Sequence, residues 1–387
     1  MNTELIDRVR LRLAGNGSGT DPAAVADAVR AEAGGPVGHT EVLDALRTLR
    51  HEFTGVGPLE TLLARPGTTD VLVTAPDEVW IDGPKGLHRT EIRFADDEAV
   101  RRLAQRLALA AGRRLDDAQP YVDGWLPGAG SQGSVRLHAV LPPVAADGTC
   151  ISLRVLRPAV HDLQALRALG TFEGQGAELV QAVVAARLAF LVTGGTGAGK
   201  STLLAAMLGA VDPSERIVCV EDAGELQPGH PQFVRLIARP PNVEGAGEIT
   251  LRDLVRQALR MRPDRLVVGE VRGREVCELL NALNTGHEGG ACTLHANSPA
   301  EVPARLEALA ALGGLPRAAL HSQLAAAVQV VLHMRRAGSG RCLAEVGVLS
   351  RDASGDVRVL PVWRDGEWTK RKALLATLLT AQGVRLP

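Results

Sequence analysis

The C-terminal part of this 387-residue chain, residues 165–387, predicts an α/β fold with a mostly parallel sheet, and three observations support that prediction. Apolar runs of buried-strand length alternate with amphipathic helical patterns. A glycine-rich turn joins the first of these runs to a helix, an arrangement that binds anions elsewhere. Polar side chains directly follow several of the runs, and open parallel sheets bind their ligands at those strand ends.

The composition limits the class of protein. The formal net charge is −1, from 43 basic and 44 acidic residues, which gives no overall attraction to nucleic acid or anionic lipid. Five scattered cysteines without a C-x-x-C pair argue against a zinc ribbon and fit a reducing compartment. The sequence has no apolar signal core and no window of eighteen uncharged apolar residues. We therefore expect a cytoplasmic location.

The sequence pattern predicts that the chain has three parts, with a linker at Pro158. They are a helical N-terminal extension (1–52), an α+β domain (53–158) and the α/β domain (165–387). The α+β domain has helical periodicity over residues 96–111, and its strand patterns lie at residues 70–73, 78–81, 92–94, 135–137 and 151–155. In the α/β domain, Thr250 and Asp253 form a capping box that begins a helix ending before Pro263.

Residues 194–201 match the phosphate-loop pattern G-x-x-x-x-G-K-[ST]. An apolar run (188–193) precedes them and a helical pattern (201–208) follows. Because the chain has only four lysines, a chance match is improbable. Lys200 is expected to reach the β- and γ-phosphates of ATP, and the Ser201 hydroxyl to ligate Mg²⁺. The predicted nucleotide-binding residues are Gly194, Gly195, Thr196, Gly197, Ala198, Gly199, Lys200, Ser201 and Thr202.

Two acidic positions follow buried strands. Glu270 comes directly after residues 266–269 and is the predicted second Mg²⁺ ligand, the alternative being a strand-end carboxylate facing solvent. Glu221, Asp222 and Glu225 follow the strand at 217–220. A carboxylate there would orient or deprotonate the attacking water. We assign that role to Glu225, with Glu221 next in line.

Two histidines, His287 and His295, bracket the strand pattern at 291–295. A lone histidine is more often a packed or capping residue than a catalytic one. Two histidines at the ends of one strand, near the expected γ-phosphate, make both of them catalytic candidates.

Four segments, in this order, resemble the ATPases of type II and type IV secretion and type IV pilus assembly. The first is the glycine loop, and residues 220–226, Val-Glu-Asp-Ala-Gly-Glu-Leu, look like the family's aspartate box. Residues 256–264, leading into 269–272, look like its Walker B region. Residues 285–290 and 293–299 look like its histidine box. The resemblance extends from about residue 53 to about residue 350 and is more specific than any single motif.

Residues 55–60 and 133–143 are similar to the tight-adherence (Flp) pilus ATPases, and the high Ala, Gly and Arg content suggests an actinobacterial member. There are departures from the family pattern. Residues 128–132 lengthen a loop where the family has a compact turn, and Ala223-Gly224 replaces the usual Thr or Pro of the aspartate box. The four-cysteine zinc element of some members is absent from the sequence.

The resemblance implies a RecA-like P-loop NTPase motor domain and an N-terminal sensing domain, assembled as a homo-hexamer at the cytoplasmic face of a membrane. It also implies ATP hydrolysis with Mg²⁺, and integral membrane platform proteins as partners through which the ring would associate peripherally with the membrane. In this family, arginines of the N-terminal domain contact the nucleotide. Arg136 and Arg154 match those positions, and Arg157 matches less closely.

Two other functions compete with this one. A RecA-like nucleic-acid motor, acting in conjugation or DNA translocation, would need a basic channel bearing aromatic side chains. Aromatic residues make up only 3% of the chain, so no nucleic-acid partner is expected. An inactive nucleotide-binding scaffold would be suggested by loss of Glu225 or Glu270, and both are present.

Overall fold

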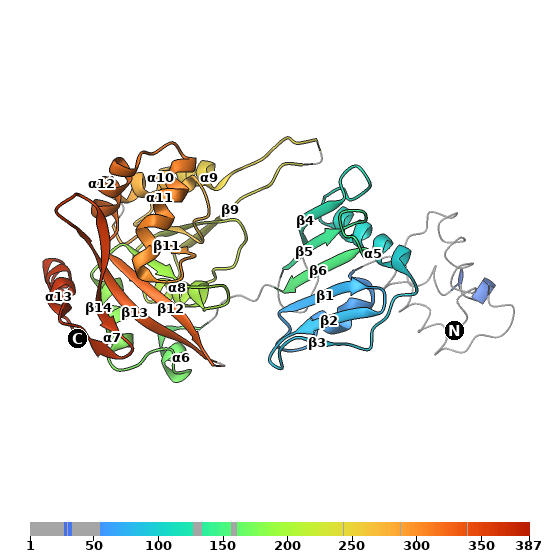
Figure 1. Ribbon diagram of the computed structural model, residues 1–387, viewed down its shortest axis with the longest axis horizontal. Coiled ribbons are helices and arrows are strands. Elements are labelled where there is room, and N and C mark those ends of the chain that lie inside the picture. The colour runs from blue at the N-terminus through green and yellow to red at the C-terminus, as the bar shows by residue number, and fades with distance from the viewer. Residues whose placement is uncertain are drawn as a thin grey trace. The chain divides into compact units, whose positions relative to one another are not determined.

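The structure is a computed structural model that describes residues 27–28, 30–32, 55–126, 134–155, 161–242, 244–286, 288–338 and 340–387. The chain divides into two compact units, Met1–Arg157 and Pro158–Pro387 (Figure 1). Residues 27–28 and 30–32 are helical. The rest of the predicted N-terminal extension, the lengthened loop at 128–132, Arg157 and the predicted linker at Pro158 lie outside the described residues.

The N-terminal unit contains an antiparallel sheet of six strands in the order β3-β2-β1-β6-β5-β4. Its strands are β1 (Asp70–Ala75), β2 (Glu78–Asp82), β3 (His88–Arg89), β4 (Tyr121–Leu126), β5 (Val135–Val140) and β6 (Cys150–Val155). Its helices are η1 (Gly57–Leu59), α4 (Glu60–Leu63) and α5 (Asp97–Ala110). Along β5 and β6, buried apolar residues alternate with half-buried or exposed ones, and the buried residues pack with α5 in one hydrophobic core.

One predicted strand of this unit is wrong. Ile92 and Phe94 do not belong to a strand, because the third strand is the two-residue β3, which pairs directly with β2 after the predicted turn. Both side chains instead pack against the core, and Phe94 donates its backbone N–H to the Pro76 carbonyl. Their alternation therefore reflects packing rather than strand pairing. The sequence pattern also missed β4.

The C-terminal unit has a nine-stranded sheet in the order β15-β14-β13-β12-β7-β11-β10-β8-β9. The six strands from β12 to β9 run parallel, and the other three extend the sheet antiparallel. The strands are β7 (Phe190–Thr193), β8 (Ile217–Glu221), β9 (Phe233–Ile237), β10 (Arg265–Val268), β11 (Ala291–Leu294), β12 (Val330–Ala337), β13 (Gly340–Arg351), β14 (Val357–Arg364) and β15 (Glu367–Trp368).

Helices cover both faces of this sheet (Figure 1). They are α6 (Leu163–Ala168), α7 (Gly176–Ala185), α8 (Lys200–Gly209), α9 (Leu251–Ala258), η2 (Leu259–Met261), α10 (Glu275–Leu283), η3 (Pro299–Glu301), α11 (Val302–Leu312), α12 (Arg317–Ala327) and α13 (Lys372–Ala381). No helix in the described part of the chain is both long and apolar enough to cross a membrane. The predicted capping box is present, since the Thr250 side chain accepts from the Asp253 backbone and Asp253 returns the bond.

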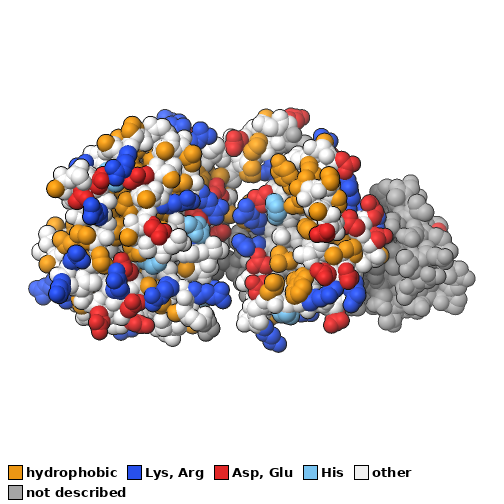
Figure 2. Space-filling model, in the orientation of Figure 1, with side chains coloured by type: hydrophobic (Ala, Val, Ile, Leu, Met, Phe, Trp, Pro, Cys, Tyr) orange, Lys and Arg blue, Asp and Glu red, His pale blue; other side chains and the backbone are white. Residues whose placement is uncertain are grey.

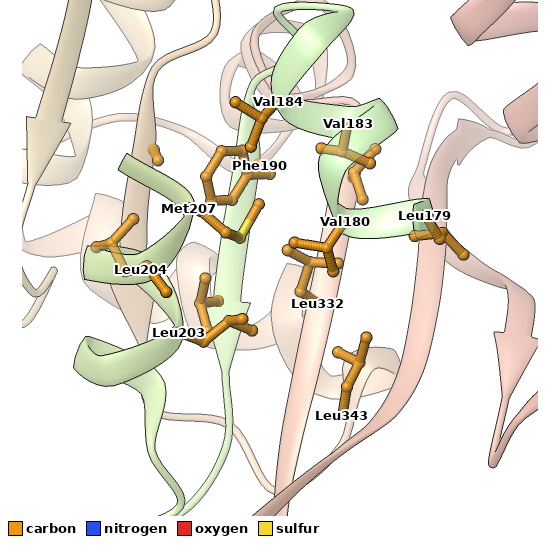
Figure 3. Packing of buried hydrophobic residues seen from close by; sticks show 14 of the residues in the cluster. Leu179, Val180, Val183, Val184, Phe190, Leu203, Leu204, Met207, Leu332 and Leu343 are labelled. Carbon is orange, nitrogen blue, oxygen red and sulfur yellow. The ribbon is translucent and has the colours of Figure 1, made fainter. Parts of the chain in front are cut away.

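The two faces have separate cores because successive strand residues point in opposite directions. On β7, Phe190 and Val192 face the core formed with α7 and α8, whereas Leu191 faces the core formed with α9 to α12. Figure 3 shows the first core, where residues of α7 and α8 meet Phe190 and Leu332 on the sheet. This packing fixes α8 against the strand that precedes the glycine loop.

Candidate active site

The glycine loop (residues 194–201) joins β7 to α8, so the N-terminus of α8 points at the loop. Gly194, Gly197 and Gly199 have φ angles of +146°, +70° and +93°, which other residues rarely adopt. No heavy atom lies within 4 Å of the position that a Cβ would take at Gly195 or Gly197. The loop is therefore open on one side and lined by backbone, and its shape fits a phosphate group.

Lys200 lies within this site rather than on the surface. It is 7% exposed, and its Nζ donates to the Gly195 carbonyl at 2.9 Å and lies 3.3 Å from His295 Nδ1. Burial lowers the pKa of the Lys200 ammonium, while the carboxylates of Glu270 and Glu225 act in the opposite direction. Because Lys200 is largely buried and its charge is not fully balanced by these carboxylates, the site favours an anionic ligand.

The His295 ring lies between Lys200 and Glu270. Its Nε2 lies 2.8 Å from Glu270 Oε1, and Arg272 donates to the other Glu270 oxygen. Burial and the nearby Lys200 lower the pKa of the imidazole, which favours the neutral ring. Because Nδ1 faces the Lys200 ammonium, it accepts, and the ring proton sits on Nε2 toward Glu270. The ends of β7, β10 and β11 thus bring together three residues predicted from the sequence.

The end of β8 carries the second acidic group. Glu221 is 3% exposed, and its Oε1 accepts from the backbone N–H groups of Glu225 and Leu226 at 3.1 and 3.0 Å. Burial raises the pKa of Glu221 to about 7. Glu225 is exposed, and its charge raises the pKa of Lys200 slightly against the larger effect of burial. Asp222 is exposed at the start of this turn.

The donors available for Mg²⁺ are few. Ser201 and Thr202 are half-buried in the first turn of α8. Within the described residues, no cluster of three or more His, Cys, Asp or Glu side chains is arranged to hold a metal ion. Mg²⁺ is commonly held by one or two protein ligands together with phosphate oxygens and water. The Ser201 hydroxyl and the Glu270 carboxylate fit that kind of binding.

The other predicted site residues are placed as follows. His287 lies outside the described residues. Arg136 and Arg154 are register partners on β5 and β6 of the N-terminal unit. Arg136 donates two hydrogen bonds to the Asp123 carboxylate, at 2.9 and 2.7 Å, in a bidentate pair. Its guanidinium also lies over the Trp125 ring. Arg154 donates to Asp70 at 2.8 Å.

Sequence reasoning missed several residues beside the glycine loop. Arg341 of β13 donates to the Gly197 carbonyl at 2.8 Å, and His333 of β12 lies 3.0 Å from the Thr193 hydroxyl. His333 interrupts an otherwise apolar strand run, a signal that could have found it. A cavity of about 190 Å³ also borders the loop and is lined by Gly194, Gly195, His295, Ala296, Asn297, Glu301 and Arg305.

The fold and the site define an α/β protein with a phosphate-type glycine loop at the carboxyl edge of a parallel sheet. The chain belongs to the type II/IV secretion system protein family, whose model matches residues 52–360. It is 70% identical over 329 residues to a putative conjugal transfer protein of Mycobacterium tuberculosis, covering 84% of this chain and 93% of that protein.

More distant proteins are also similar to this chain. The type IV secretion system protein PtlH of Bordetella pertussis is 29% identical over 322 residues, covering 76% of this chain and 93% of PtlH. The solved structure of the pilus retraction motor PilT with bound ADP is similar with a TM-score of 0.51 at 20% identity. That match covers 81% of this chain and 84% of PilT, and it supports the fold alone.

Proposed function

We propose that this chain is an ATP-hydrolysing motor whose C-terminal part (residues 165–387) is a RecA-like P-loop domain. The observation that carries the proposal is the meeting of Lys200, His295 and Glu270 beside the open glycine loop. Such a grouping combines an anion cradle, a partly desolvated cation and a carboxylate, which are the parts that phosphoryl transfer requires. The family membership supports the same reading.

In the proposed mechanism, the backbone N–H groups of the loop and the N-terminus of α8 bind the phosphates. Lys200 exchanges its bond to the Gly195 carbonyl for a phosphate oxygen. The Ser201 hydroxyl and the Glu270 carboxylate would hold Mg²⁺, which would supply neutralisation of the phosphate charge. The neutral His295 lies beside the Glu270 carboxylate, with its Nε2 at 2.8 Å from Oε1. Glu225 orients the attacking water and accepts its proton as the water oxygen bonds to the γ-phosphorus and the bond to the bridging oxygen breaks, which releases ADP and phosphate.

We further propose that the motor is a homo-hexamer, with residues 53–158 as an N-terminal domain that supplies Arg136 or Arg154 to the nucleotide. It would power assembly of a tight-adherence or type IV pilus-like filament, or type II/IV secretion, at the cytoplasmic face of a membrane through integral membrane platform proteins. The similarity of residues 55–60 and 133–143 to tight-adherence pilus ATPases supports that branch, and the composition supports an actinobacterial source.

A second candidate, a nucleic-acid motor in conjugation, is favoured by one observation. The Mycobacterium tuberculosis relative at 70% identity is named a putative conjugal transfer protein. Against this candidate, aromatic residues are scarce. Basic and acidic side chains are also interspersed on the face of each unit in Figure 2, rather than gathered in a basic stripe.

One experiment tests both candidates. Phosphate release by the purified full chain is measured with ATP, with and without Mg²⁺, and then with added single-stranded DNA. The pilus or secretion motor is expected to hydrolyse ATP only with Mg²⁺ and to be indifferent to DNA. Stimulation by DNA would support the nucleic-acid motor, and absence of turnover from an assembled oligomer would exclude both.

A further inference from the structure

Glu221 is hydrogen-bonded to the turn that carries Glu225. A single carboxylate oxygen, Oε1, accepts from two successive backbone N–H groups, those of Glu225 and Leu226. The Leu226 side chain is itself buried in the core beside α8. The turn is therefore tied to the end of β8 at one side and to the core at the other, so the position of Glu225 depends on Glu221.

Glu221 also touches the strand end that carries Glu270. A Cβ placed on Gly269 would lie 2.7 Å from Glu221 Cγ, and the next nearest atoms, Oε1 and Cδ, belong to the same side chain. Gly269 donates its N–H to Val220 at 2.8 Å and accepts from the Thr293 hydroxyl at 2.7 Å. The Glu221 side chain thus fills the space that any other residue at position 269 would need.

We propose that Glu221 is a positioning residue that sets the Glu225 turn and the Glu270 strand end relative to each other. This inference rests on the proposed ATPase function. The alternative is that Glu221 is itself the base for the attacking water. Against that alternative, the side chain is almost fully buried and its Oε1 is already used by two N–H groups.

Two substitutions at position 221 separate the roles. Glu221→Gln removes the charge but keeps an oxygen that accepts both N–H groups, so turnover is expected to stay within a few fold of the wild type. Glu221→Ala removes the acceptor and is expected to lower kcat about 10²-fold, the cost of a displacement near 1 Å in a catalytic site. The KM for ATP should change little, because the glycine loop is held by other contacts. Glu248→Ala, at an exposed carboxylate after β9, is the control.

Gly269→Ala approaches the same contact from the other strand. Alone, it is expected to lower both kcat and the unfolding temperature, because the new methyl group collides with Glu221. In the Glu221→Ala background the collision is removed, so Gly269→Ala should add little further loss. Such non-additivity is the signature of a direct contact, and independent effects would multiply.

Hydrogen exchange supplies a readout that does not depend on turnover. The backbone amides of Glu225 and Leu226 should exchange faster in Glu221→Ala than in the wild type, and should remain protected in Glu221→Gln. If Glu221→Gln is as inactive as Glu221→Ala while both amides stay protected, Glu221 acts through its charge and the proposal is overturned. The proposal would also be overturned if the double variant lost turnover by the product of the losses seen in Gly269→Ala and Glu221→Ala alone. A wild type without ATP turnover would refute the proposed function, while the exchange and stability measurements would still decide the role of Glu221.

Discussion

The two units of the chain place similar charged side chains in opposite surroundings. In the C-terminal unit, Lys200 and Glu221 are nearly fully buried. Burial lowers the pKa of Lys200 and raises the pKa of Glu221. In the N-terminal unit, the Arg136 and Arg154 side chains are 40% and 59% exposed and each is paired with an aspartate. Burial therefore shifts the ionisation of Lys200 and Glu221, whereas water screens the exposed arginine pairs, which contribute little energy to the fold.

The largest effect is expected at Lys200. Lys200→Ala removes the ammonium from the site, and ATP turnover should fall by about 10³-fold or more, as when a preorganised charge-stabilising donor is lost. Lys85→Ala, at an exposed lysine between β2 and β3, is the matched control and should keep full activity. Unchanged hydrolysis in a folded Lys200→Ala protein, checked by circular dichroism, would remove the basis for the nucleotide site.

Arg154 tests whether a paired surface arginine also has a catalytic role. If it reaches the γ-phosphate in the assembled ring, Arg154→Ala should lower turnover about 10³-fold. If its only role is the exposed ion pair with Asp70, stability should change by no more than about 1 kcal/mol and turnover not at all. Arg89→Ala, which removes a comparable exposed pair with Asp77, is the control.

Mixing two inactive proteins shows which subunit supplies the arginine. If the arginine acts on the neighbouring subunit, rings co-assembled from Lys200→Ala and Arg154→Ala proteins contain some intact interfaces and should regain part of the turnover. The mixture is assayed at several ratios, with mixed rings verified by mass. Zero activity at every ratio would count against action in trans, and repeating the mixture with Arg136→Ala shows which arginine acts.

Substitutions of Glu225 and Glu270 should separate binding from chemistry. Glu225→Gln keeps the shape but removes the proton acceptor, so ATP binding should persist while turnover falls about 10²-fold. Glu270→Gln should instead shift the Mg²⁺ concentration that turnover requires. Titration calorimetry with ATP and Mg²⁺-dependent rates distinguish the two variants. Normal turnover in Glu225→Gln would mean that another group accepts the proton.

The smallest effect concerns stability and pH. The pKa of Glu221 is about 7 in the folded chain, against the usual 4.5, so the folded state binds its proton more tightly. The stability from this proton is present below about pH 4.5 and is lost as pH rises through 7. Between pH 5 and 8.5 the wild type should lose about 2 to 3 kcal/mol of unfolding free energy relative to Glu221→Gln. The unfolding free energies are measured by denaturation at each pH. If they change with pH to the same extent in the two proteins, Glu221 does not titrate in this range.

Local patterns predicted much of the C-terminal unit because each depends on contiguous residues. The apolar runs at β7, β8, β10 and β11 and the capping box at Thr250 are present in the structure. The alternation at Ile92 and Phe94 was misread as a strand, since an alternating pattern reports which side is buried and not whether a partner strand lies alongside.

The sequence by itself determined the glycine loop and the family, because a phosphate cradle needs glycines, lysine and hydroxyl at set spacings along one stretch of chain. The tertiary structure decided which strands are neighbours, and so placed His295 between Lys200 and Glu270. It also brought His333 and Arg341 to the loop across 140 and 144 residues of sequence. Such pairings depend on how the whole sheet packs between its two helical layers, and no local pattern encodes that.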